Sequence, residues 1–258
     1  MRIPKMILFD YGQTIGNETP HNDLAGHTAL LAHALTNPHS LGAEEVAAKA
    51  WELMSEVYGF NRNVQRHERE YEILNCMILK YLYASLSIRL DLTDQEIDRL
   101  YWDAAAPAVP ADGINELLSW LMAHGIRIGV ISNIMYAAPV VEERIHRLVP
   151  EADFEFIIAT SDYLFLKPSP RIFELGLIRA REKTPEIQAD EIWYCGDTYA
   201  ADVVGARSVG MVPVWYQGAV QKYGIQAAKS EKPAAAPAED VLTIHHWDEL
   251  RKVLEPLF

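Results

Sequence analysis

Two patterns of apolar positions divide the chain near residue 110. After that point short uncharged apolar runs alternate with helical stretches, and before it one such run, Met6–Phe9, ends abruptly at Asp10. A run of this kind is typical of a strand buried on both faces. We expect further strands at 126–131, 154–159, 191–195, 212–216 and 241–245, and a closing helix at Trp247–Leu254. Strands that alternate with helices predict the α/β class, with a Rossmann-like parallel sheet covered by helices on both faces.

The stretch from about residue 20 to residue 105 has helical periodicity alone. Apolar residues at helical spacing predict one helix through Val46, Ala50, Leu53 and Val57 and another through Tyr71, Leu74, Ile78 and Leu82. A third helix begins at Thr93, which forms a capping box with Glu96, while Leu92 and Ile97 form a hydrophobic staple. With no strand expected between them, these helices should pack on one another. The sequence therefore predicts a helical insertion at 16–108 and a core made of 1–15 and 109–258.

Two further segments are expected to separate elements. Proline and glycine at 107–113 interrupt the helical pattern and mark a boundary. The next helix has an apolar stripe from Ile114 and should end at Gly125. The stretch 227–239 holds two prolines and several lysine or serine positions, so it is predicted to be an exposed loop or linker.

The composition limits the classes of partner. Half of the 258 residues are apolar, and 23 Lys and Arg stand against 36 Asp and Glu, which gives a net charge of −13. This charge repels nucleic-acid backbones and anionic membranes, so neither is an expected partner. No apolar run approaches the roughly 20 residues that span a bilayer, and no signal peptide is evident. Two cysteines, Cys76 and Cys195, cannot build a disulfide framework, so we expect a cytoplasmic protein, its oligomeric state left open.

Polar side chains follow four of the predicted strands, at the point where each strand ends. In chain order they are Asp10, Ser132 with Asn133, Lys167, and Asp197 with Asp202. Each alone is ordinary helix-cap or turn chemistry. Because ligands bind at the carboxyl ends of the strands in a doubly wound sheet, together they predict one site with a hydroxyl, a lysine and three carboxylates.

Four sequence motifs in this order resemble those of the haloacid dehalogenase-like hydrolase superfamily, and of its members with a helical cap inserted after the first strand. The motifs stand here as FDYGQT at 9–14, VISN at 130–133, KPSPRIF at 167–173 and GDTYAADVVGA at 196–206. Any one of them is a weak signal, but four with the right spacing are a strong one. The resemblance covers essentially the whole chain.

The resemblance implies Asp10 as a nucleophile that attacks phosphorus and becomes an aspartyl phosphate. It implies Mg²⁺ as the cofactor, because a carboxylate approaches an anionic phosphoryl group only when cations neutralise the charge. The implied metal ligands are Asp10, the backbone carbonyl of Gly12, and Asp197, while Asp202 holds a metal-bound water or Lys167.

The same resemblance implies the groups that bind the phosphoryl oxygens. Lys167 supplies a positive charge and Ser132, with nearby backbone amides such as that of Asn133, donates hydrogen bonds. Asp10, Ser132 and Lys167 are thus the implied catalytic residues. The resemblance therefore implies Mg²⁺-dependent hydrolysis of a small phosphorylated metabolite, whose identity would depend on the cap.

The first motif departs from the family's phosphatase pattern at Gly12. Phosphatases of the family have Asp there, which protonates the leaving group and then activates water; Gly12 does neither. Loss of such an acid typically costs ~10²–10⁴ in rate. The substrate then either has a leaving group that needs no proton, such as an acyl phosphate, or another residue supplies the acid when a cap closes.

Several candidates for that replacement stay open. Acidic or imidazole groups of the insertion are available at Glu52, Glu56, His67 and Glu70, and Tyr11 or Gln13 can orient a water. A further alternative is the loss of catalysis, which would leave a metal- and anion-binding module. Branches that cleave phosphorus–carbon bonds also lack this Asp. Dehalogenation ranks lower, because dehalogenases have a tyrosine two residues after the nucleophile and lack the Gly-Asp pair found here at 196–197.

Three other residues are assigned to the core. Trp51 and Trp102 of the insertion are expected to be buried, with substrate contact as the minor alternative. Cys195 is expected to be a small buried strand residue rather than a nucleophile.

Overall fold

The computed structural model describes residues 2–57, 72–219 and 241–258. Its centre is a six-stranded sheet in the order β10-β9-β8-β1-β6-β7, and every pairing in it is parallel. The strands are β1 (Met6–Phe9), β6 (Arg127–Ser132), β7 (Ile157–Ala159), β8 (Ile192–Gly196), β9 (Val212–Tyr216) and β10 (Leu242–Ile244). The α/β class is confirmed, and all six predicted strands form within three residues of their expected starts.

Side chains of β1 alternate between the two faces of the sheet, and each face has its own helices. Ile7 and Phe9 enter the larger core under α5 (Ile114–Ala123), α6 (Ala138–Leu148) and α11 (Trp247–Leu254). Met6 and Leu8 enter the core under α7 (Pro170–Lys183) and α8 (Val204–Ser208). All four strand residues are fully buried, as expected for a central parallel strand.

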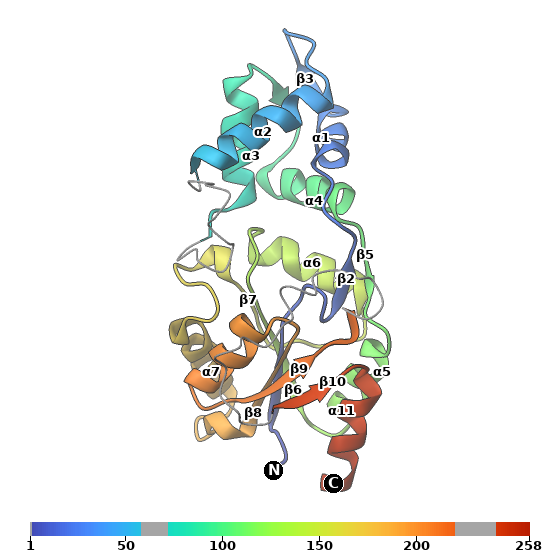
Figure 1. The fold of residues 1–258 in the computed structure, drawn as a ribbon, viewed down its shortest axis with the longest axis vertical. Helices are drawn as coiled ribbons and strands as arrows, with labels where there is room; N and C mark the ends of the chain where they lie inside the picture. Colours follow the sequence, from blue (N-terminus) through green and yellow to red (C-terminus); the bar gives the residue numbers. More distant parts are fainter. Residues whose placement is uncertain (1, 58–71, 220–240) are drawn as a thin grey trace.

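The helical insertion lies between β1 and β6 in sequence, at one end of the sheet in space (Figure 1). It contains α1 (Asp23–Leu31), α2 (Ala43–Val57), α3 (Asn75–Ser85) and α4 (Asp94–Ala105). These helices share a separate apolar core that includes Leu30, Val46, Leu82 and Ile97. The predicted capping box at the start of α4 is present, since Thr93 N donates to Glu96 Oε2 at 2.8 Å and Glu96 N to Thr93 Oγ1 at 3.4 Å.

The expectation that this stretch contains helices alone is wrong. β3 (Ala34–Thr36) pairs antiparallel with β4 (Arg89–Leu90), and β2 (Gly16–Glu18) pairs antiparallel with β5 (Ala108–Pro110). Strands of two or three residues are too short for an alternating pattern to identify them. The second pair carries the chain into and out of the insertion, so the predicted boundary at 107–113 contains a strand.

The two tryptophans of the insertion differ. Trp102 is buried as predicted, but Trp51 is 60% exposed on α2, so its assignment to the core is wrong. Trp51 keeps the helical spacing of its helix but lies beside the buried stripe of Val46 and Ala50 rather than on it. Tyr71 and the predicted linker at 227–239 lie outside the described residues.

Within residues 2–57, 72–219 and 241–258, no helix combines the length and the apolar character that crossing a membrane requires.

Candidate active site

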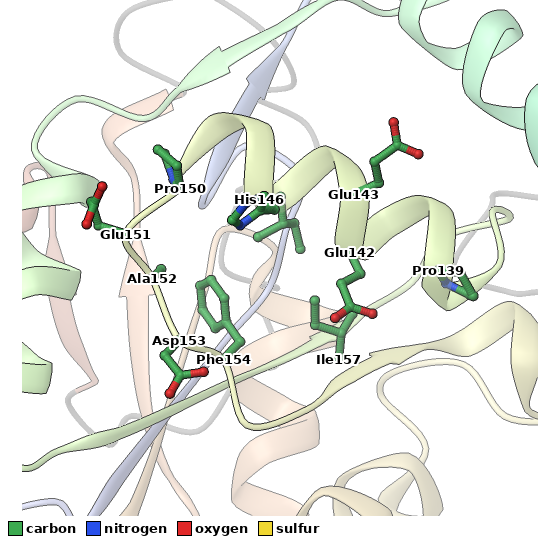
Figure 2. Close-up of a pocket in the computed structure, with 11 residues that line it drawn as sticks. Pro139, Glu142, Glu143, His146, Pro150, Glu151, Ala152, Asp153, Phe154 and Ile157 are labelled. Atoms are coloured by element: carbon green, nitrogen blue, oxygen red, sulfur yellow. The ribbon is translucent and has the colours of Figure 1, made fainter.

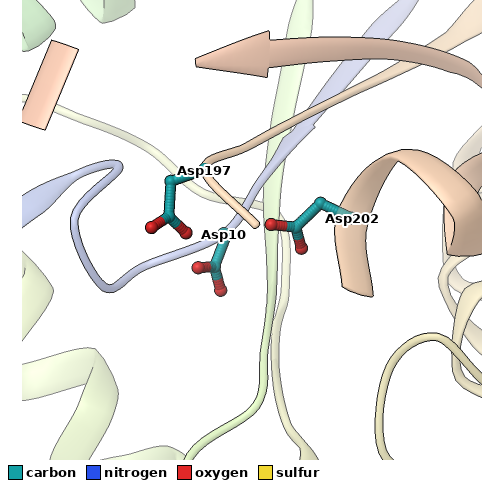
Figure 3. Close-up of side chains that lie close together, drawn as sticks. All are labelled: Asp10, Asp197 and Asp202. Atoms are coloured by element: carbon teal, nitrogen blue, oxygen red, sulfur yellow. The ribbon is translucent and has the colours of Figure 1, made fainter. Parts of the chain in front are cut away.

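Asp10 stands at the carboxyl end of β1, at the centre of the sheet. Its backbone N–H donates to Cys195 O at 2.8 Å, which extends the pairing of β1 with β8 by one residue. This register brings Asp10 beside Asp197, which follows β8, and Asp202, which lies in a π-helical turn at Tyr199–Val203 before α8. Figure 3 shows the three carboxylates side by side. All three are buried, at 8%, 5% and 1% exposure.

The Lys167 ammonium lies among these groups and uses all three of its N–H donors. It donates to Asp10 Oδ1 at 2.9 Å, to Asp202 Oδ1 at 2.6 Å and to the hydroxyl of Tyr194 at 2.8 Å. Its side chain is 2% exposed, so a solvated surface role for this lysine is excluded. An ammonium buried to this degree is stable only when it is paired and fully hydrogen-bonded, which is the case here.

The pKa shifts in the site follow from burial and from the crowding of like charges. Burial raises the pKa of Asp197 well above its ordinary range, and the neighbouring Asp10 and Asp202 carboxylates raise it further. Burial also raises the pKa of Asp202, although Lys167 opposes the effect. Burial alone would lower the pKa of Lys167, but the attraction of Asp10 and Asp202 reverses the sign and raises it. The described residues thus place three carboxylates against one lysine.

This excess of buried negative charge fits a hard cation. Carboxylate oxygens of Asp10, Asp197 and Asp202 all lie within 4.8 Å of one another, and no other group of three or more His, Cys, Asp and Glu in the described parts of the chain meets the same test. Oxygen ligands with room for water are what Mg²⁺ prefers. A side chain begun at Gly12 would meet nothing within 4 Å, so the backbone there borders open space.

Both carboxylate oxygens of Asp202 accept hydrogen bonds, which fix the position of the side chain. Oδ1 accepts from Lys167, and Oδ2 accepts from the backbone N–H of Thr198 at 2.8 Å. Gly196 allows this approach, because a Cβ at that position would overlap the Asp202 carboxyl. Of the two roles implied for Asp202, the geometry favours holding Lys167.

Ser132 and Asn133 lie at the end of β6. Ser132 is buried at the strand terminus. The side-chain amide of Asn133 makes two hydrogen bonds with the backbone of Lys167. Nδ2 donates to Lys167 O at 2.9 Å, and Oδ1 accepts from Lys167 N at 2.8 Å. Asn133 therefore fixes the loop that carries Lys167.

The side chains on either side of Gly12, those of Tyr11 and Gln13, both hydrogen-bond to Glu18. The hydroxyl of Tyr11 donates to Glu18 Oε1 at 3.2 Å, and Gln13 Nε2 donates to Glu18 O at 3.1 Å. Gln13 has a φ of 57°, in the left-handed region that glycine adopts without strain. Among the acid candidates of the insertion, Glu52 and Glu56 are exposed on α2, while His67 and Glu70 lie outside the described residues.

Two site residues were missed from the sequence. Tyr194 is the third acceptor of Lys167 and donates to Ile131 O at 2.7 Å. The sequence could have indicated Tyr194, because it lies two residues before Gly196 on the same strand. Residues two positions apart on a strand face the same side of the sheet. Arg144 donates to Tyr11 and lies on the buried face of α6 with Val141 and Ile145, but an arginine is usually exposed, so the sequence did not single it out. Cys195 is buried in β8, as predicted, and burial raises the pKa of its thiol well above 9.0.

A separate cavity of about 630 Å³ lies between α6 and the segment at 150–157 (Figure 2). Its lining includes the carboxylates of Glu142, Glu143, Glu151 and Asp153 and the imidazole of His146. Four carboxylates at its rim repel a phosphate, and none of the residues discussed above lines it. It is not part of the candidate active site.

Comparison with known proteins identifies the family. A model of the family described as haloacid dehalogenase-like hydrolase matches residues 61–215, a range that holds the second, third and fourth motifs but not Asp10. A glyceraldehyde 3-phosphate phosphatase from Pyrococcus abyssi is 34% identical over 113 residues, which is 43% of this chain and 42% of that protein. The matched part is therefore less than half the length of that relative.

Solved structures show the same fold over the whole chain. A 2-haloacid dehalogenase from Pseudomonas syringae is 21% identical, with 99% of this chain and 100% of that chain covered and a TM-score of 0.64. A putative hydrolase of the same superfamily from Bacillus subtilis, bound to magnesium, is 20% identical, with 98% and 99% covered and a TM-score of 0.51. The match of the family model and the order of the motifs agree with this fold, and the chain belongs to the haloacid dehalogenase-like hydrolase family.

Proposed function

We propose that this chain is an Mg²⁺-dependent phosphatase that acts on a small phosphorylated metabolite through an aspartyl phosphate on Asp10. The observation that carries the proposal is the buried cluster in which Lys167 bridges Asp10 and Asp202 beside Asp197. A cluster of this charge and burial suits an anionic substrate only with a second cation present. The phosphatase name of the curated relative and the magnesium in one structural neighbour support the same chemistry.

In the proposed reaction a carboxylate oxygen of Asp10 attacks phosphorus, and the bond from phosphorus to the leaving group breaks. Lys167 and Ser132 contact the phosphoryl oxygens as charge develops on them. Water then cleaves the aspartyl phosphate, which releases inorganic phosphate and regenerates Asp10. When bound, Mg²⁺ would supply charge neutralisation, held by Asp10, Asp197 and the carbonyl of Gly12.

Gly12 restricts the leaving group in this proposal. With no acid at this position, a leaving group that is stable as an anion departs most readily, as the carboxylate of an acyl phosphate does. We further propose that the helical insertion acts as a cap that closes over Asp10 and sets the substrate. Interdomain movement described for the Bacillus subtilis neighbour supports that role.

The test measures phosphate release with Mg²⁺ from acetyl phosphate and from glyceraldehyde 3-phosphate, with Asp10→Asn as the control. Turnover of acetyl phosphate alone, lost in the control, is the expected result. Turnover of both substrates would mean that another residue replaces the acid. If neither substrate is turned over above the control, the phosphatase proposal is wrong. Calorimetry with Mg²⁺ and inorganic phosphate then tests the alternative, a metal- and anion-binding module without catalysis.

Gly12→Asp sharpens the test, because the position has room for a side chain and its backbone is outside the left-handed region. The variant restores the acid of the family pattern. We expect hydrolysis of glyceraldehyde 3-phosphate to rise by about 10²-fold or more, with little gain on acetyl phosphate. Equal gains on both substrates would contradict a missing acid.

A further inference from the structure

Arg144 is a buried cation outside the phosphate site, and its contacts reach three separate segments. It lies on α6 with a side chain that is 4% exposed. Nε donates to the hydroxyl of Tyr11 at 2.7 Å, Nη1 to Asp103 Oδ1 at 2.6 Å, and Nη2 to Ala106 O and, at 3.4 Å, to Glu18 Oε1. A guanidinium in this arrangement uses most of its donors in one fixed plane.

The three segments meet where the chain enters and leaves the helical insertion. Tyr11 follows Asp10 directly, Glu18 ends β2, and Asp103 and Ala106 lie at the end of α4, just before β5. Arg144 thus links Tyr11, which directly follows the proposed nucleophile Asp10, to both segments that join the insertion to the core. In Figure 1, α6 lies below α4, with β2 and β5 running beside it.

Aromatic packing reinforces this junction. The Arg144 guanidinium lies 4.1 Å from the ring centre of Trp102, whose indole N–H donates to Glu18 Oε1 at 2.8 Å. Trp102 stacks on Tyr136, with ring centres 4.1 Å apart, and Tyr136 lies in the loop that follows Asn133. The charge is also balanced, because Glu18 and Asp103 face Arg144 and the neighbouring Arg147.

We propose that Arg144 is a positioning residue: it fixes Tyr11, and with it the loop that carries Asp10, to the two segments that connect the helical insertion to the core. Its role in turnover rests on the proposed function, whereas its hold on the loop does not. Residues 11–16 bond to one another through Ile15 N and Gly16 N, which donate to Tyr11 O at 2.9 and 3.1 Å. Releasing the Tyr11 side chain should therefore loosen the whole turn.

The chain provides a matched control in Arg147, one helical turn later. Arg147 also donates to Asp103, at 2.7 and 2.8 Å, but it is 45% exposed and makes no described hydrogen bond or ion pair with Tyr11 or Glu18. Arg144→Met and Arg147→Met both remove a partner of Asp103, yet only the first releases the nucleophile loop. Arg144→Lys keeps the charge but not the planar fork, and Tyr11→Phe removes a single hydrogen bond.

The first measurement is amide hydrogen exchange, which needs no activity. We expect faster exchange at residues 13–18 and 108–111 in Arg144→Met and Arg144→Lys, and faster exchange at 13–18 in Tyr11→Phe. Exchange in Arg147→Met should match the parent protein. Unchanged exchange in Arg144→Met, or an equal increase in Arg147→Met, would overturn the proposal.

The second measurement is turnover of acetyl phosphate, at a temperature where every variant is folded. For Arg144→Met we expect kcat to fall by about tenfold to a hundredfold while KM changes little, since a displaced nucleophile costs rate more than binding. The double variant with Tyr11→Phe should be no slower than Arg144→Met alone, and Arg147→Met should keep full activity. Multiplying losses in the double variant, or a lower activity in Arg147→Met equal to that of Arg144→Met, would also overturn it.

The two proposals fail differently. A parent protein without Asp10-dependent turnover but with the expected exchange pattern would refute the phosphatase function and leave Arg144 as the residue that holds the loop. Normal turnover in every variant, with unchanged exchange, would leave the phosphatase function intact and refute the role of Arg144.

Discussion

Asp98 in the helical insertion should make the stability of the protein depend on pH. This carboxyl on α4 is 1% exposed and accepts from Asn75 Nδ2 at 2.9 Å. Burial raises its pKa from 3.8 to about 6, against the opposing hydrogen bonds of Asn75 and Cys76. Because the folded pKa is higher than the unfolded one, the folded state holds its proton longer. The stabilisation is complete below pH 3.8 and is lost as pH rises to about 6.

The substitution Asp98→Asn removes this titration and keeps a side chain of the same shape. A shift from 3.8 to about 6 corresponds to at most about 3 kcal/mol, of which about 2 kcal/mol falls between about pH 4.5 and pH 7.5. We therefore expect the free energy of unfolding of Asp98→Asn, minus that of the parent protein, to be about 2 kcal/mol larger at the higher pH, where the parent has lost this stabilisation.

Urea denaturation at these two pH values measures the difference directly, and subtracting the parent protein cancels the other titrating groups. Asp94→Asn is the matched control, because Asp94 lies on the same helix but is exposed and paired with Lys80 at 2.9 Å. Its difference from the parent should change little with pH. A difference for Asp98→Asn that is the same at both pH values would refute the reasoning.

His27 explains why the parent protein alone would not reveal this effect. The ring is fully buried on α1, with Nδ1 3.1 Å from the hydroxyl of Tyr83, and burial lowers its pKa from 6.5 to about 4. A lowered histidine pKa gives stability that is present above pH 6.5 and lost as pH falls toward 4. The slopes of His27 and Asp98 have opposite signs over nearly the same pH range, so they largely cancel until one is removed.

Three further substitutions test the active site. Tyr194→Phe leaves one donor of the buried Lys167 ammonium without an acceptor, so we expect a loss of about 1–3 kcal/mol in urea denaturation and slower turnover of acetyl phosphate; unchanged stability would show that water replaces the hydroxyl. Asn133→Ala frees the loop of Lys167 and should lower kcat more than it raises KM, whereas an effect on KM alone would indicate direct substrate binding. Gly196→Ala introduces a Cβ into the space of the Asp202 carboxyl and should abolish turnover and weaken Mg²⁺ binding in calorimetry; wild-type binding would contradict the tight packing.

The central strands of the sheet were predictable from the sequence because they bury both faces. Uninterrupted apolar runs such as Met6–Phe9 identify strands of this kind, and the polar residues that follow β1, β6 and β8 mark the site. The short antiparallel pairs of the insertion gave no such signal, because pairs such as β2 and β5 are set by contacts between residues about 90 positions apart. The exposure of Trp51 was missed for a related reason, since periodicity does not show which face of a helix meets a neighbour.

Within the site, residue types at strand ends were predictable, but the partners of their side chains were not. The sequence predicts that Asp10 and Lys167 meet at one edge of the sheet. It does not show that Asn133 hydrogen-bonds to the Lys167 backbone or that Tyr194 is the third acceptor of the Lys167 ammonium. These contacts depend on side-chain rotamers across neighbouring strands. Arg144 is the extreme case, because its four acceptors come from segments up to 133 positions away in sequence.

The saturated ammonium of Lys167 sets a condition on how a phosphoryl group binds. All three N–H donors are in use, so a phosphoryl oxygen must take the place of one acceptor. Asp202 is anchored a second time by Thr198 N, and the Tyr194 hydroxyl is anchored to Ile131 O. Asp10 Oδ1 accepts from Lys167 alone among the described hydrogen bonds, so in the proposed reaction it is the acceptor to be released. In the proposed reaction, a phosphoryl oxygen replaces Asp10 as an acceptor of Lys167. The same step therefore frees the Asp10 carboxylate, which then attacks the phosphorus.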